Sequence, residues 1–171
     1  VIILISTIFS QSFKDLTERP TYNPIKIEKP IIFDGVVDNQ EWSKAQIATN
    51  FNGSGTFQGQ PSDLRTEARL FYDEKNIYVG FIAYVDKEDL RYSITKRDNL
   101  DEKDDRVWIN IDAFDDEALT YGIGVSAGGV QIDGRATYGF DKSLDLIYES
   151  KVSVYDDRYE AESVSYTHLT L

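Results

Sequence analysis

The sequence has no cysteine and no methionine, and its 171 residues include a single histidine, His168. Without cysteine, disulfide frameworks, thiol nucleophiles and cysteine-rich zinc sites are excluded. His168 lies in a C-terminal stretch that does not match the rest of the domain, so we assign it no role. Histidine-based catalytic triads, general bases and metal sites are therefore not expected.

Basic residues are also scarce. The chain has 18 lysines and arginines against 30 aspartates and glutamates, which gives a net charge of -12. Binding to a phosphate backbone or to an anionic lipid surface needs a basic surface. We therefore expect no nucleic-acid partner, and neutral or cationic partners fit better.

The chain is rich in aromatic residues, with 11 tyrosines and 9 phenylalanines, and its length suits one domain. Apolar residues alternate along residues 66–72 and 77–85, and Gly128-Gly129 separates two further alternating stretches. In residues 77–85 both faces are apolar, which is typical of a central strand. The predicted fold is all-β: a two-sheet antiparallel β-sandwich.

One short helix is expected near the N-terminus. Asp38 and Glu41 have the spacing of an N-cap and its reciprocal partner, which would place Trp42 and Ala45 near one face. We expect this tryptophan to be structural.

The two ends differ from the domain. Residues 1–12 begin with the apolar run VIILISTIF and read as a truncated signal peptide, or alternatively as a buried first strand. Residues 13–27 read as a linker, residues 28–162 as the domain, and residues 163–171 as a non-native tail, because VSYTHL resembles the translation of a transposon end used in shotgun sequencing libraries. On this interpretation the protein is exported, to the periplasm, outer membrane or extracellular space, and a C-terminal part is missing.

The stretch RDNLDEKDDRVWINID, residues 97–112, combines an acidic loop with a strand whose two faces differ. Val107 and its alternate neighbours point to a core, and Trp108 with Asn110 points to the other side. Either a second layer of the protein covers Trp108, or a ligand binds there. Both 77–85 and 106–112 are predicted to lie inside a sheet.

An ordered set of motifs supports one family resemblance. The set is Asp34-Gly35, Glu41-Trp42 with Ala45, Pro61, Thr66, Tyr72-Asp73, Ile77-Tyr78-Val79-Gly80, Arg97-Asp98, Asp104-Asp105 and Ile111-Asp112. It resembles the family 9 carbohydrate-binding modules, in the version found at the N-terminus of large exported Bacteroidetes-type proteins. The resemblance implies a jelly-roll-like sandwich that binds sugar without catalysis, bound calcium in some members, and attachment to a glycoside hydrolase or an outer-membrane protein.

The predicted sugar site contains Trp108, Asn110, Arg97, Asp112 and Tyr121. An indole can stack on a pyranose, and the polar groups can read its hydroxyls. The resemblance implies a clamp of two tryptophans, as in well-studied members of the family, so the second wall here is Tyr121 or Tyr138, lies in a missing part, or is absent. Gly122 and Gly124 would leave a bare strip beside the indole.

The main hypothesis is a non-catalytic module that binds neutral oligo- or polysaccharide. Three further hypotheses accompany it. The domain could instead dock onto the C-terminal part of the same protein as a structural unit. A glycoside hydrolase needs two carboxylates at a defined separation, which 30 acidic residues do not specify. Calcium could bind Asp98, Asp101, Asp104 and Asp105, with Glu102, unless this loop is simply solvated.

Overall fold

The structure is a computed structural model that describes residues 21–52, 60–113, 115, 118–137 and 139–166. The predictions for residues 1–12, for Tyr138 and for His168 lie outside the described residues.

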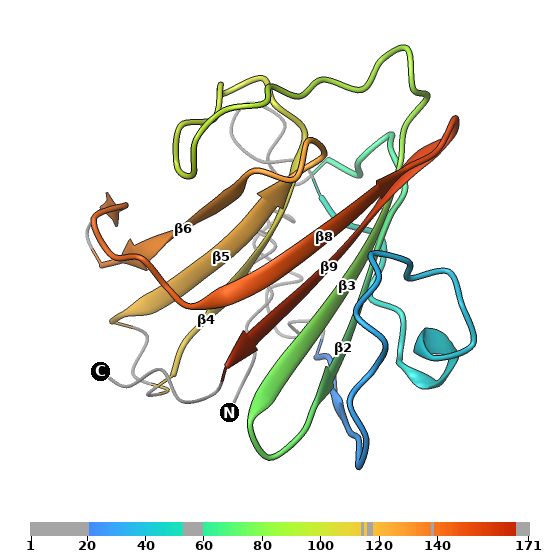
Figure 1. Ribbon diagram of the computed structural model, residues 1–171, viewed down its shortest axis with the longest axis vertical. Helices are drawn as coiled ribbons and strands as arrows, with labels where there is room; N and C mark the ends of the chain where they lie inside the picture. Colours follow the sequence, from blue (N-terminus) through green and yellow to red (C-terminus); the bar gives the residue numbers. More distant parts are fainter. Residues whose placement is uncertain (1–20, 53–59, 114, 116–117, 138, 167–171) are drawn as a thin grey trace.

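Two sheets face each other (Figure 1). The five-stranded sheet has the order β1-β2-β3-β9-β8 and the four-stranded sheet the order β4-β5-β6-β7. The strands are β1 Ile25–Lys26, β2 Thr66–Tyr72, β3 Asn76–Tyr84, β4 Arg106–Ile111, β5 Thr120–Ser126, β6 Gln131–Ala136, β7 Phe140–Asp141, β8 Tyr148–Val154 and β9 Arg158–Tyr166. The predicted all-β, two-sheet fold is confirmed. The short parallel pair β1–β2 is the exception to the antiparallel pattern.

The main core lies between the sheets. Leu70, Val79 and Val125 are fully buried there, each on the inward face of its strand, with Ile109 and Ala161 nearby. A second apolar cluster lies on the outer face of the five-stranded sheet, under residues 31–45, which we call the N-terminal strap. The strap packs Trp42 in a stacked contact on Phe71, with ring centroids 5.2 Å apart. This confirms the structural role of Trp42.

The predicted helix is absent from the described residues. The segment contains only a three-residue 3-10 turn, η1 Trp42–Lys44. Asp38 does not cap it: the Asn39 side-chain oxygen accepts the N–H groups of Glu41 (2.9 Å) and Trp42 (3.2 Å). The backbone of Asp38 instead donates to a buried glutamate on β9, which holds this part of the strap extended.

Strand β3 lies between β2 and β9, as its two apolar faces predicted. Strand β4 pairs only with β5 among the described residues, so the prediction of an interior position for residues 106–112 is wrong. Its clean alternation of buried and half-buried residues suits an edge strand with one covered face. Strand β9 continues to Tyr166, and Val164 pairs with Tyr78 of β3.

None of the helical turns in the described residues has the length and apolar character needed to span a bilayer.

Candidate functional site

Trp108 lies on the outer face of the four-stranded sheet, half-buried and flat on two glycines of β5. A Cβ atom built on Gly122 would lie 1.9 Å from the indole, and one on Gly124 would lie 2.5 Å from it. The indole therefore fills the strip that the sequence analysis expected to be bare. Its Nε1–H donates to the side-chain oxygen of Asn110 at 2.8 Å.

A second aromatic ring extends this outer face. Phe140 of β7 meets Trp108 edge to face, with centroids 5.2 Å apart, and is 45% exposed. It lies over Gly134, where a Cβ atom would come within 2.8 Å of the phenyl ring. Two rings thus cover three glycines on neighbouring strands.

The other predicted partners of Trp108 lie elsewhere. Tyr121 pairs with Ile111 and is buried in the main core, so it cannot form a second wall beside the indole. Asp112 is buried just after β4, where its carboxylate accepts the N–H of Asp115. Only Asn110 lies beside Trp108, as predicted.

Arg97 contacts the opposite side of this sheet. Its partner Asp133 pairs with Ile123, a core residue, so Asp133 also faces the interior. The expectation that Arg97 reaches Trp108 is therefore wrong. The segment before β4 runs along β6, where the N–H of Asp98 donates to the carbonyl of Gln131, and this directs Arg97 inward.

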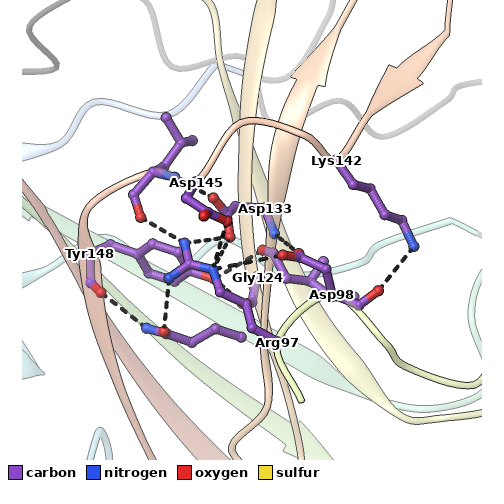
Figure 2. Close-up of polar contacts among 10 residues, drawn as sticks. Arg97, Asp98, Gly124, Asp133, Lys142, Asp145 and Tyr148 are labelled. Atoms are coloured by element: carbon purple, nitrogen blue, oxygen red, sulfur yellow. Dashed lines mark hydrogen bonds and ion pairs between the residues drawn. The ribbon is translucent and has the colours of Figure 1, made fainter. Parts of the chain in front are cut away.

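The Arg97 guanidinium is held by partners from two segments, β6 and the residues at the start of β8 (Figure 2). Nε donates to Asp133 at 2.7 Å, and Nη2 to the Leu146 carbonyl at 2.6 Å. Nη1 donates to the Gln131 side chain at 3.4 Å, and the guanidinium lies over the Tyr148 ring. Burial raises the pKa of Asp133, while hydrogen bonds from Leu146 and Arg97 lower it.

The predicted calcium ligands do not converge. Each accepts a hydrogen bond from the chain itself: Asp98 from the N–H of Asp133, Asp101 from Lys103, Asp104 from Ser93 and Asp105 from Arg91. Within the described residues one trio of carboxylates does converge, namely Asp98, Asp133 and Asp145, within 4.8 Å of one another. Arg97 makes an ion pair with all three, so a cation already lies among them.

A groove of about 580 Å³ opens beside Arg97. It crosses β8, the edge strand of the five-stranded sheet, and is walled by Phe33, Ile94, Thr95, Arg97, residues 128–131 and residues 148–151. Its volume is in the range of about 300–1,000 Å³ that small-ligand sites occupy. Planar polar groups lie next to an aromatic ring there, which is a suitable arrangement for a ligand with both hydroxyls and an apolar face.

Apart from Arg97, the groove residues were not among the site residues predicted from the sequence. Phe33 ends the short apolar stretch Ile31-Ile32-Phe33, and Gln131 follows the Gly128-Gly129 turn; neither pattern marks a binding site. The Gly128-Gly129 turn was recognised as a turn, and Gly129 has a φ of 80° there. Its position next to Arg97 depends on contacts between residues more than 30 positions apart.

These features define a class: a small β-sandwich with a polar and aromatic groove across one sheet edge. The family model described as carbohydrate family 9 binding domain-like matches residues 32–166. The chain belongs to this family, which the sequence resemblance had indicated.

Solved structures agree on the fold. A family 9 carbohydrate-binding module from Caldicellulosiruptor kristjanssonii in complex with cellotriose is similar, with a TM-score of 0.61 and 19% identity, over 84% of this chain and 66% of that one. A module from the same organism in complex with glucose has a TM-score of 0.60 and 17% identity, over 84% of this chain and 68% of that one. A protein from Bacteroides uniformis, provisionally named as carbohydrate-binding, has a TM-score of 0.62 and 9% identity, over 84% of this chain and 71% of that one. No curated protein sequence matches the chain.

Proposed function

We propose that this protein is a non-catalytic carbohydrate-binding module that holds a neutral sugar in the groove beside Arg97. One observation carries the proposal: Arg97 and Gln131 present a guanidinium and an amide 3.4 Å apart in a groove that Phe33 also lines. Family membership and the sugars bound by structural neighbours support it.

The groove has the donors that hydroxyl recognition needs. Nη1 of Arg97 carries two hydrogens, and Gln131 accepts one of them. Nε2 of Gln131 also carries two, and the Tyr148 carbonyl accepts one at 3.0 Å. One hydrogen on each group can therefore point to a ligand. Because Asp133 balances the charge of Arg97, the groove suits a neutral ligand.

Trp108 with Asn110 is the second candidate position for the sugar. We favour the groove because the indole already covers Gly122 and Gly124 and its N–H is bonded to Asn110. The indole therefore contributes to the packing of the four-stranded sheet. Phe140 would be the neighbouring ring on this alternative face.

Calorimetry with glucose and cellotriose, comparing Gln131→Ala and Trp108→Ala with the wild-type protein, tests the position. Weak binding is expected, because polar contacts largely replace contacts with water. Gln131→Ala should weaken affinity about fivefold, since a hydrogen bond contributes about 1 kcal/mol net. Trp108→Ala should leave affinity unchanged and lower the melting temperature. The reverse pattern would move the site to the outer face.

A second candidate function, as an alternative to sugar binding, is docking onto a further domain of the same protein. Large aliphatic side chains are exposed, notably Ile94 (87%), Ile147 (74%) and Ile32 (65%). Uncovered apolar surface of this kind mediates association when it is contiguous. Sedimentation of the isolated domain would support docking if it self-associates, and would weaken it if the domain remains monomeric at high concentration.

We also propose that the protein acts after export, in the periplasm, outer membrane or extracellular space. The support is the apolar run in residues 1–9 followed by small polar residues. Fractionation of cells that express the complete protein tests this proposal.

A further inference from the structure

The N-terminal strap is held to the five-stranded sheet by two buried carboxylates on β9. Glu160 and Glu162 are both fully buried, and both point to the outer face, away from the main core. Each accepts two backbone N–H groups of the strap and one side-chain N–H. A buried carboxylate needs such donors, because burial without them is costly.

The two carboxylates hold different parts of the strap. Glu162 accepts the N–H groups of Asp34 (2.9 Å) and Gly35 (2.6 Å), and the indole N–H of Trp42 (2.8 Å). Glu160 accepts those of Val37 (2.7 Å) and Asp38 (3.0 Å). Glu162 thus fixes the residues directly after Phe33, whereas Glu160 fixes the strap further along.

Phe33 is the point where the strap meets the groove. Phe33 lines the groove, and its carbonyl accepts a hydrogen bond from Nζ of Lys151 at 2.7 Å. The same Nζ lies 5.0 Å from the Phe33 ring centroid. Lys151 is the direct cross-strand neighbour of Glu162, so the carboxylate and the groove strand β8 share one register position.

The turn between Phe33 and the strap leaves little freedom. Gly35 has a φ of 88°, and a Cβ atom there would lie 3.2 Å from Cβ of Lys151. The chain therefore passes close to β8 in a conformation that favours glycine. With Asp34 and Gly35 held by Glu162, the backbone that directly follows Phe33 is fixed next to β8.

We propose that Glu162 is a positioning residue for the sugar groove: through the backbone of Asp34 and Gly35 it holds Phe33 as the aromatic wall. This inference rests on the proposed sugar-binding function of the groove. Glu162 itself does not touch the ligand.

The experiment compares Glu162→Gln with Glu160→Gln in the full chain, using cellotriose calorimetry and thermal unfolding. Both variants replace a fully buried carboxylate on the same face of β9, so both should lower the melting temperature. Only Glu162→Gln should weaken cellotriose binding, by about tenfold or ~1.4 kcal/mol. Affinities are measured at a temperature at which both variants remain folded.

Phe33→Ala completes the test. It should weaken binding by a similar factor in the wild-type background and add little in the Glu162→Gln background, because the two changes remove the same wall. If Glu162→Gln does not fold, Gly35→Ala replaces it, since this change disturbs the same turn while leaving the carboxylate in place.

Equal loss of affinity in Glu162→Gln and Glu160→Gln, or full binding by Phe33→Ala, would overturn the positioning role while leaving the proposed function intact. If the wild-type protein binds neither glucose nor cellotriose, the proposed function and this inference fall together.

Discussion

Gly122 shows how a single missing side chain shapes a surface. Its Cα supports the Trp108 indole, which occupies the space where any Cβ atom would lie. The glycine is therefore required for packing, and not for an unusual backbone conformation, since only Gly35 and Gly129 among the described glycines have a positive φ.

We predict that Gly122→Ala destabilises the protein by about 1–3 kcal/mol, the usual cost of forcing an extra group into a packed site. Gly139→Ala is the matched control, because no atom lies within 4 Å of the Cβ position there. Urea unfolding of the two variants measures the difference. Equal stability of both would show that the indole does not rest on Gly122.

Glu162 should also give the stability a specific pH dependence. Burial raises its pKa above the ordinary value of 4.5, although hydrogen bonds from Gly35, Trp42 and Asp34 act in the opposite direction. The folded protein thus binds this proton more tightly than the unfolded chain does. Its contribution to stability is complete below pH 4.5 and is lost as the pH rises through the folded-state pKa.

We predict that the stability of the wild-type protein relative to Glu162→Gln falls as the pH rises above 4.5, because the Glu162 pKa is raised from that value and glutamine does not titrate. Taking the difference removes the contribution of the other acidic groups. Urea unfolding of both proteins across this range measures it. A difference that is constant, or that grows with pH, would show that the Glu162 pKa is not raised.

At the scale of elements, the 3-10 turn at Trp42–Lys44 could be capped by either of two neighbouring side chains, Asp38 or Asn39. The sequence pattern favoured Asp38 as the cap, whereas the structure uses the side chain of Asn39. The outcome depends on Glu160, which lies 122 positions away from Asp38 and holds its backbone N–H.

We expect Asn39→Ala to cost about 1 kcal/mol, the typical value for loss of a capping side chain. Asp38→Ala should cost little, because among the described residues the contact of its exposed carboxylate is an ion pair with Arg158 at 3.7 Å. Thermal unfolding distinguishes the two. A larger effect of Asp38→Ala would restore the capping box that the sequence suggested.

Features that depend on contacts between residues close in the sequence could be predicted, and features that depend on distant residues could not. The turn before β3 was predictable because Asp73 accepts the N–H groups of Lys75 and Asn76, all within four residues. The inward side of β4 was predictable from alternation alone. The groove was not, since Arg97, Gln131 and Phe33 meet only through pairings across the whole chain.

At the scale of the whole molecule, the acidic residues of the expected loop do not converge on one point, and the carboxylates that converge in the described residues are Asp98, Asp133 and Asp145. Arg97 already lies among Asp98, Asp133 and Asp145. We therefore predict that neither calcium nor a chelator changes the melting temperature of the wild-type protein. An increase on adding calcium, reversed by the chelator, would show that the ion competes with the guanidinium.

The central claim is that a neutral sugar binds in the groove and not on the outer aromatic face. An NMR titration of the isotope-labelled protein with cellotriose tests it most directly, because the two surfaces lie on opposite sides of the four-stranded sheet. We predict that the amides of residues 128–131 and 148–151 shift, while the Trp108 indole N–H and the amides of Gly122 and Gly124 do not. Shifts confined to Trp108 and these glycines, or no shifts at all, would contradict the account.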